Sequence, residues 1–370
     1  MIGTASASVS KRLFSRIQSA GPITFAEFMR TALYDPDDGY YCRDDVERWG
    51  REGDYRTSPE RSELFAATFA RYFACLYEQL GSPAEWTILE AGAGSGYFAR
   101  GVLRTLAGTF PEVFAATRYV IDELSPSAEQ RCREITKSFT GRVEFARLRD
   151  ITLKPGVIFS NELLDAFQVH RVTLHGGELK EFYVDANANG EFGWTLKSPS
   201  TPRLQANLDL CGIELPERQT IEVNLELENW FSTVAASLKA GFVVSVDYGY
   251  QARELYIAEN QGSGTLRGFR RHSFIEDVLA EPGGCDLTAS VNWTAVEKIG
   301  EQHQLEVVSF KRQDKFLIDE GLLGQLEIES RNARTDAERI RLSTDAREMI
   351  LPDGMAAKFQ VMTQQKKFDE

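Results

Sequence analysis

Apolar and polar residues between positions 86 and 160 alternate between short apolar runs and longer amphipathic stretches. The runs have strand length, and the amphipathic stretches carry apolar residues at helical spacing. Strands are predicted at Trp86–Glu90, Tyr119–Asp122, Val143–Leu148 and Val157–Ser160, with helices through Phe98 and Leu106 and over Ser125–Phe139. Alternating strands and helices predict an α/β fold with a parallel, doubly wound sheet.

The pattern changes on both sides of this stretch. Residues 10–35 predict two short helices around Gly21-Pro22, residues 35–62 are loop-rich, and residues 61–80 return to helical spacing. Residues 170–200 predict β-hairpins, because glycines and asparagines separate short β-rich runs. The core resumes with a helix at 226–239 and a strand at 242–247, and residues 251–292 are loop-rich. After them the sequence predicts a helix at 293–302, a strand at 305–310 and a charged helical region at 320–345.

These patterns predict three consecutive regions. An N-terminal helical lid spans 1–82, and a C-terminal helical extension spans 316–370. Between them, 83–315 form the core, with a hairpin insertion at about 170–200 and a loop insertion at about 251–292.

Composition limits the partners and the chemistry. The 370 residues include 42 Lys and Arg against 55 Asp and Glu, and the net charge of −13 disfavours nucleic acid as a partner. Apolar runs are too short for a membrane span. The five scattered cysteines lack a CxxC pair and the four histidines lack a cluster, so neither a disulfide framework nor a metal site is predicted. We expect a cytoplasmic protein.

The sharpest local signal is a glycine-rich turn directly after the first core strand. The sequence reads E-x-G-x-G-x-G, with Glu90, Gly92, Gly94 and Gly96. Glycines between a strand and a helix let the backbone approach a ligand closely. A dinucleotide fingerprint would need glycine where this chain has Tyr97. The pattern instead resembles motif I of class I S-adenosylmethionine (SAM) methyltransferases.

A second acid, Glu123, ends the next predicted strand. A carboxylate at this position accepts hydrogen bonds from both ribose hydroxyls of a nucleoside cofactor. Asp122, directly before it, is the alternative. A glycine turn that binds nothing, with acids merely ending strands, is the competing interpretation.

Further segments resemble, in the same order, those of the MidA-like methyltransferases, the family that includes the mitochondrial complex I assembly methyltransferase. They are GPITFAEFM, LYDPDDGYY, GDYRTSPE, SNELLDAFQVHR, VDYGY, GTLRGFRRH and PGGCDLTASVNW. The resemblance covers about residues 10–365 and implies a SAM-dependent methyltransferase, with a Rossmann-like fold, whose eukaryotic member methylates an arginine of a respiratory complex I subunit. Ser290 and Asn292 depart from the family pattern DxTAHVDF, which leaves the substrate open.

Three acids are candidates for orienting the methyl acceptor. Glu162 and Asp165 follow the fourth core strand, where the carboxyl ends of strands form the ligand crevice. Their spacing predicts one side of a helical turn, and stabilising a helix N-terminus is the alternative role. Asp247 ends the fifth strand, where capping that strand is the alternative.

Ser58 and Glu60, in the predicted lid, are candidate ligands for the methionine end of the cofactor; capping the following helix is the alternative. The sequence thus predicts a SAM-dependent enzyme that methylates an arginine of a protein substrate, with a respiratory-complex subunit as the implied candidate. Two other functions stay open: an assembly factor that acts by client binding, and a small-molecule methyltransferase.

Overall fold

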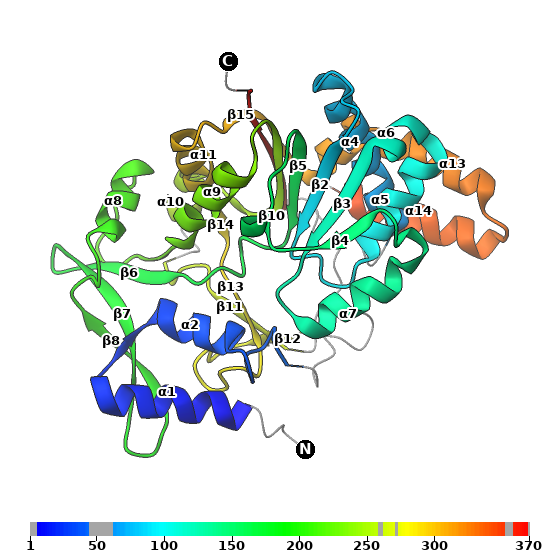
Figure 1. Ribbon diagram of the computed structural model, residues 1–370. Coiled ribbons are helices and arrows are strands. Elements are labelled where there is room, and N and C mark those ends of the chain that lie inside the picture. The colour runs from blue at the N-terminus through cyan, green and yellow to red at the C-terminus, as the bar shows by residue number, and fades with distance from the viewer. Residues whose placement is uncertain (1–5, 44–61, 258–261, 271–272, 352–357, 369–370) are drawn as a thin grey trace. The chain divides into compact units, whose positions relative to one another are not determined.

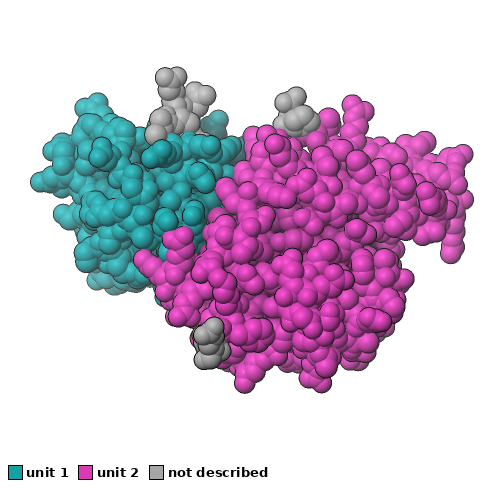
Figure 2. Space-filling model, turned by 90° about the horizontal axis from the view of Figure 1, so that it is seen from above, with its two compact units in different colours: residues 1–55, 164–230, 249–299 teal, residues 56–163, 231–248, 300–370 magenta. Residues whose placement is uncertain are grey.

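The structure is a computed structural model that describes residues 6–43, 62–257, 262–270, 273–351 and 358–368. The chain divides into two compact units (Figure 2). Unit 1 comprises residues 1–55, 164–230 and 249–299, and unit 2 comprises residues 56–163, 231–248 and 300–370. Each unit combines three separate stretches of the chain. This division differs from the three consecutive regions expected from the sequence, which remain a prediction.

Unit 2 contains seven strands of an eight-stranded sheet, whose remaining strand, β14 (Val291–Asn292), pairs with the end of β10 (Gly241–Tyr250) (Figure 1). The order of the seven strands is β15 (Glu306–Arg312), β16 (Phe359–Lys366), β10, β5 (Gly156–Asn161), β2 (Trp86–Ala91), β3 (Thr117–Asp122) and β4 (Val143–Phe145). Neighbouring strands from β10 to β4 are parallel, whereas β16 is antiparallel to both of its neighbours. The strand order reverses between β2 and β5, which makes their carboxyl ends the expected ligand crevice.

The helices of unit 2 bury an aromatic core against this sheet. Phe69 and Phe73 of α4 pack with Phe98 of α5 and Phe159 of β5, and the rings of Phe98 and Phe159 stack 4.3 Å apart. The helices are α4 (Glu63–Gln79), α5 (Tyr97–Thr109), α6 (Pro111–Ala116), α7 (Pro126–Ile135), α12 (Gln313–Asp319), α13 (Leu322–Asn332) and α14 (Asp336–Ile350), with 3-10 turns at Lys137–Phe139 and Leu148–Asp150. Helix α9 (Glu226–Ser237) contains the unit boundary after Trp230.

Unit 1 combines the N-terminal helices with two small antiparallel sheets. Helices α1 (Ser6–Ala20) and α2 (Phe25–Tyr34) share a core with the first sheet, ordered β1 (Ile23–Thr24), β7 (Glu178–Ala186), β6 (His170–His175) and β9 (Thr220–Val223), with β8 (Phe192–Lys197) on β7. The second sheet is ordered β12 (Ser273–Ile275), β11 (Arg267–Arg270) and β13 (Asp286–Thr288). Unit 1 also contains the helices α8 (Arg203–Leu210) and α10 (Ala252–Ile257) and the short strand β14 (Val291–Asn292). Helix α11 (Trp293–Gln302) contains the unit boundary after Ile299.

Most of the predicted elements are confirmed, including the parallel core, the N-terminal helices and the hairpins. Two expectations were wrong. The segment 251–292 holds α10 and a three-stranded sheet, and the C-terminal extension ends in β16 at an inner position of the large sheet. Within the described ranges, no helix combines the length and apolarity needed to cross a membrane.

Candidate cofactor and acceptor site

Three glycines carry the chain from β2 into α5. Gly92, Gly94 and Gly96 have φ angles of 70°, 56° and 79°, in the left-handed region that glycine favours. A Cβ atom on Gly96 would lie 2.9 Å from Cα of Cys132, and one on Gly92 would lie 3.0 Å from Cδ1 of Leu163. At Gly96 the turn is therefore packed too closely for a side chain, and at Gly92 it lies next to the segment that leaves β5.

Glu123, directly after β3, faces this turn. Its carboxylate accepts hydrogen bonds from Gly94 N at 2.8 Å and from Ser125 N at 2.9 Å. Asp122 instead accepts a hydrogen bond from Arg147 Nη1 at 3.0 Å. Of the two acids that the sequence offered, the structure brings Glu123 to the glycine turn.

Glu90 lies in β2 and is 4% exposed. Tyr119 Oη, on the neighbouring strand β3, donates a hydrogen bond of 2.7 Å to its carboxylate. Burial raises the pKa of Glu90 from its ordinary value of 4.5 to about 8; the negative charge of Glu123 adds to the increase, and the Tyr119 hydrogen bond opposes it. Burial in β2 therefore favours the neutral form of the Glu90 carboxyl group.

Glu162 leaves β5 in an uncommon backbone conformation. Its φ angle is 52°, although it is not a glycine. Glu162 N donates a hydrogen bond of 2.9 Å to Val246 O of the neighbouring strand, and Asn161 Nδ2 donates one of 3.1 Å to Glu162 Oε1. Such strained residues concentrate at functional sites.

The helical turn expected over Glu162 and Asp165 was wrong. Residues 162–167 form bends and a turn, because the left-handed Glu162 ends the strand without starting a helix. Asp165 is 5% exposed and belongs to unit 1, whereas Glu162 belongs to unit 2. Asp247 is fully buried in β10 and accepts a hydrogen bond from Tyr248 N at 2.9 Å.

Ser58 and Glu60 lie outside the described residues. Tyr119, which sequence reasoning missed, contacts Glu90 because β2 and β3 pair in parallel with Ile88 opposite Tyr119. The sequence carries no signal for this contact, because it depends on the register of the two strands.

Comparison with known proteins decides the family. The model of a family described as "Putative S-adenosyl-L-methionine-dependent methyltransferase" matches residues 68–311, well over half of the chain. The chain belongs to this family. It is therefore a SAM-dependent methyltransferase, and the resemblance found in the sequence is confirmed.

The relatives of this methyltransferase extend over most of its length. "Protein arginine methyltransferase NDUFAF7 homolog, mitochondrial" of Drosophila melanogaster is 30% identical, with 80% of this chain and 70% of the relative covered. The Danio rerio protein of that name, without "homolog", is 26% identical over 95% of this chain and 86% of its own length. The crystal structure of a "likely methyl transferase" from Burkholderia thailandensis, bound to S-adenosyl-homocysteine, has a TM-score of 0.87 at 28% identity, covering 99% and 94% of the two chains. This structure confirms the expected methyltransferase fold.

The residues of the methyltransferase around the glycine turn suit the cofactor. The glycines present a backbone without side chains, and the Glu123 carboxylate offers two acceptor oxygens beside it. A ribose diol has two donors, which such a carboxylate can accept together. The exposed backbone and this carboxylate therefore fit the ribose of a nucleoside cofactor.

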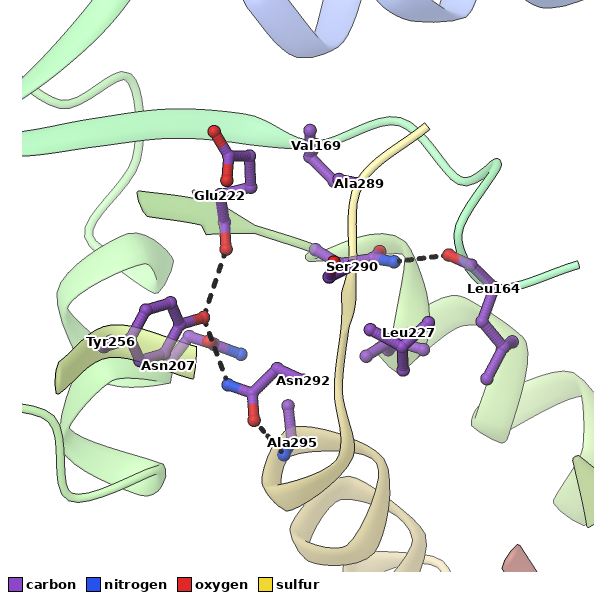
Figure 3. Close-up of a pocket in the computed structure, with 12 residues that line it drawn as sticks. Leu164, Val169, Asn207, Glu222, Leu227, Tyr256, Ala289, Ser290, Asn292 and Ala295 are labelled. Atoms are coloured by element: carbon purple, nitrogen blue, oxygen red, sulfur yellow. Dashed lines mark hydrogen bonds between the residues drawn. The ribbon is translucent and has the colours of Figure 1, made fainter. Parts of the chain in front are cut away.

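The departure at Asn292 has a structural role in unit 1. Its Oδ1 accepts a hydrogen bond from Ala295 N at 3.2 Å and so caps α11, while Nδ2 donates to Tyr256 Oη at 3.3 Å (Figure 3). Asparagine and aspartate cap helices about equally well, so this exchange preserves the cap. The adjoining cavity, lined by Ser290, has about 10 Å³ of room for the centre of a water molecule, which is too little for an arginine side chain.

Proposed function

We propose that this methyltransferase transfers a methyl group to an arginine nitrogen of a protein substrate. The observation that carries the proposal is the 30% identity, over 80% of the chain, with a Drosophila protein named protein arginine methyltransferase. A respiratory-complex subunit is the first candidate acceptor. A cytoplasmic location remains a prediction, since the curated relatives are named as mitochondrial.

Unit 2 supplies the residues assigned to the cofactor. Glu123 would accept both ribose hydroxyls, and Gly92, Gly94 and Gly96 would let the backbone lie against the cofactor. Glu90, in its charged form, would attract the cationic amino group. Ser58 and Glu60 keep their predicted place at the methionine end. Bound SAM supplies an electrophilic methyl group on a sulfonium.

The remaining carboxylates are assigned to the acceptor. Glu162 and Asp165 would hold the guanidinium by charge-assisted hydrogen bonds, which fix its plane and direct one nitrogen lone pair. As the new nitrogen–carbon bond forms and the carbon–sulfur bond breaks, that nitrogen loses a proton, which we assign to Glu162. Asp247, fully buried beside this edge of the sheet, would stabilise the positive charge.

Two measurements test the proposal. Calorimetry should show that S-adenosyl-homocysteine binds the wild-type protein and binds Glu123→Gln at least tenfold more weakly, because the neutral amide loses charge-assisted bonds. Folded wild-type protein that releases no heat would contradict the cofactor assignment. Mass spectrometry should then find a methylarginine that is present in cells with this chain and lost in cells without it. If the Gly94→Val variant fully reverses the defect of cells that lack this chain, client binding rather than methyl transfer is the function.

A further inference from the structure

The segment that follows Leu163 is buried but has no regular structure. Leu164, Asp165 and Ala166 are 1%, 5% and 5% exposed, and the chain bends and turns through them. Buried backbone carbonyls outside helices and sheets need hydrogen-bond donors from elsewhere. The donors to this segment therefore determine where the Asp165 backbone lies.

Three consecutive carbonyls of this segment accept hydrogen bonds from three distant stretches of unit 1. Asn224 Nδ2 donates to Leu164 O at 3.2 Å, and Leu164 is seen at the end of a dashed bond in Figure 3. Ala289 N donates to Asp165 O at 3.0 Å. Tyr34 Oη donates to Ala166 O at 2.7 Å. We call these three bonds the carbonyl clamp.

Each side-chain donor of the clamp is itself held in place. Asn224 Oδ1 accepts a hydrogen bond from Glu226 N at 3.1 Å, at the start of α9. The ring of Tyr34, the last residue of α2, stacks on the ring of Tyr41 with centroids 5.5 Å apart. Tyr41 Oη in turn donates to Asp286 Oδ1 at 2.7 Å. The clamp therefore links the predicted lid motif LYDPDDGYY to the segment DLTAS that contains Ala289.

The clamp fixes the backbone on both sides of Asp165. A single bond to a turn would leave the peptide planes on either side free to rotate. Bonds to three successive carbonyls fix those planes together, and the Asp165 side chain leaves the backbone between them. Fixing the backbone on both sides of a side chain is how a protein holds a charged group in a productive geometry.

We propose that Tyr34 and Asn224 are positioning residues for Asp165, and that the clamp holds its carboxylate where the methyl acceptor binds. The inference rests on the proposed function, in which Asp165 orients the acceptor. It gives Tyr34, the first tyrosine of the LYDPDDGYY motif, a role in catalysis through Asp165, without contact to substrate or cofactor.

Two nearly isosteric variants test the clamp. Tyr34→Phe removes only the hydroxyl, and Asn224→Asp keeps the oxygen that accepts from Glu226 N but removes the donor to Leu164 O. The assay measures transfer of labelled methyl from SAM to an extract of cells that lack this chain. We expect each variant to lower the maximal rate about tenfold, since a misplacement of about 1 Å can cost up to a hundredfold, while the KM for SAM stays unchanged.

Tyr77→Phe is the matched control. Tyr77 Oη also donates to a backbone carbonyl, that of Pro83, at 2.9 Å. This variant should lower the urea midpoint by a similar amount without changing the methyl-transfer rate. Equal rate losses in Tyr34→Phe and Tyr77→Phe would overturn the proposal, because loss of stability alone would then explain both.

Measurements in the Asp165→Asn background distinguish the role of the carbonyl clamp from the acceptor role of Asp165. If the clamp acts through Asp165, Tyr34→Phe causes no further loss of rate in that background. A multiplied loss would overturn the clamp while leaving the role of Asp165 intact. If Asp165→Asn itself retains the wild-type rate, the acceptor role of Asp165 fails, and the clamp proposal falls with it.

Discussion

The chain leaves β2 and β5, two neighbouring strands of unit 2, through left-handed backbone conformations. The two exits differ in the type of residue that adopts this conformation. After β2, glycines occupy the left-handed positions, and the backbone group Gly94 N is bonded to a carboxylate. After β5, the left-handed position holds Glu162, with a φ angle of 52°. One exit presents backbone and the other presents a charged side chain.

This difference shows what each exit is built for. A glycine adopts positive φ at no steric cost, whereas a residue with a Cβ is destabilised by about 1 kcal/mol or more. A glycine would suit the β5 exit better if only folding mattered. The strain at Glu162 therefore points to a requirement for its carboxylate, while the left-handed positions of the β2 exit are occupied by glycine, which has no side chain.

The largest effect is expected at Glu162. Glu162→Gln should lower the rate of methyl transfer by about 10²–10³, as removal of a charge-stabilising or proton-accepting group does in other enzymes. Glu162→Ala and Glu162→Gly should be equally inactive. The glycine variant should nevertheless be more stable than the alanine variant by about 1 kcal/mol in urea unfolding, because only alanine retains the left-handed strain. Equal stability of the two would remove the argument from strain.

The glycine exit should respond in the opposite way. Gly96→Ala places a Cβ 2.9 Å from a backbone atom of Cys132 at φ of 79°. We expect a loss of about 3 kcal/mol in stability and at least tenfold weaker binding of S-adenosyl-homocysteine by calorimetry. Gly81→Ala, at φ of 82° with nothing within 4 Å, is the control for strain alone. It should lose stability without losing affinity.

The fold was predictable where apolar periodicity reports burial, as in β2, β3, β5 and the helices around them. Strand β16 was missed because three of its six buried residues, Thr363, Gln364 and Lys366, are polar. Thr363 and Gln364 are at most 1% exposed, and Thr363 Oγ1 is paired with Tyr72 Oη at 2.9 Å. Buried polar residues that are paired with partners far along the chain interrupt the hydrophobic pattern by which a strand is detected.

The site was predictable to the level of which acids follow which strands. Glu123 was found because strand order and cofactor chemistry place an acid there. The left-handed φ of Glu162 was not, since it depends on the bond to Val246 O of the neighbouring strand. The same holds for Tyr119, whose contact with Glu90 depends on strand register. Tertiary contacts, rather than local sequence, determine these features.

Glu90 is expected to make the stability of the protein depend on pH within a defined range. Its pKa is about 8 in the folded protein against an ordinary 4.5. Between these values the folded state binds more protons than the unfolded state, so stability falls as pH rises from 4.5 to about 8. Glu90→Gln carries no charge at any pH. The unfolding free energy of this variant, relative to that of the wild type, should therefore increase across this window and then level off. A constant difference from pH 4.5 to 8 would contradict the assignment.

The smallest effect is expected at Tyr119, which tests whether Glu90 must be charged to bind the cofactor. Tyr119→Phe removes the hydrogen bond that lowers the pKa of Glu90. Affinity for S-adenosyl-homocysteine should rise with pH up to about 8 in the wild type, and the variant should need a higher pH for the same affinity. At neutral pH we expect a severalfold loss, with more protons released on binding when calorimetry is repeated in buffers of different ionisation enthalpy. Tyr72→Phe, which loses a buried hydroxyl contact with Thr363 and no carboxylate, should leave the pH profile unchanged. If both variants shift the profile equally, the backbone of the glycine turn, rather than the charge of Glu90, controls cofactor affinity at the β2 exit.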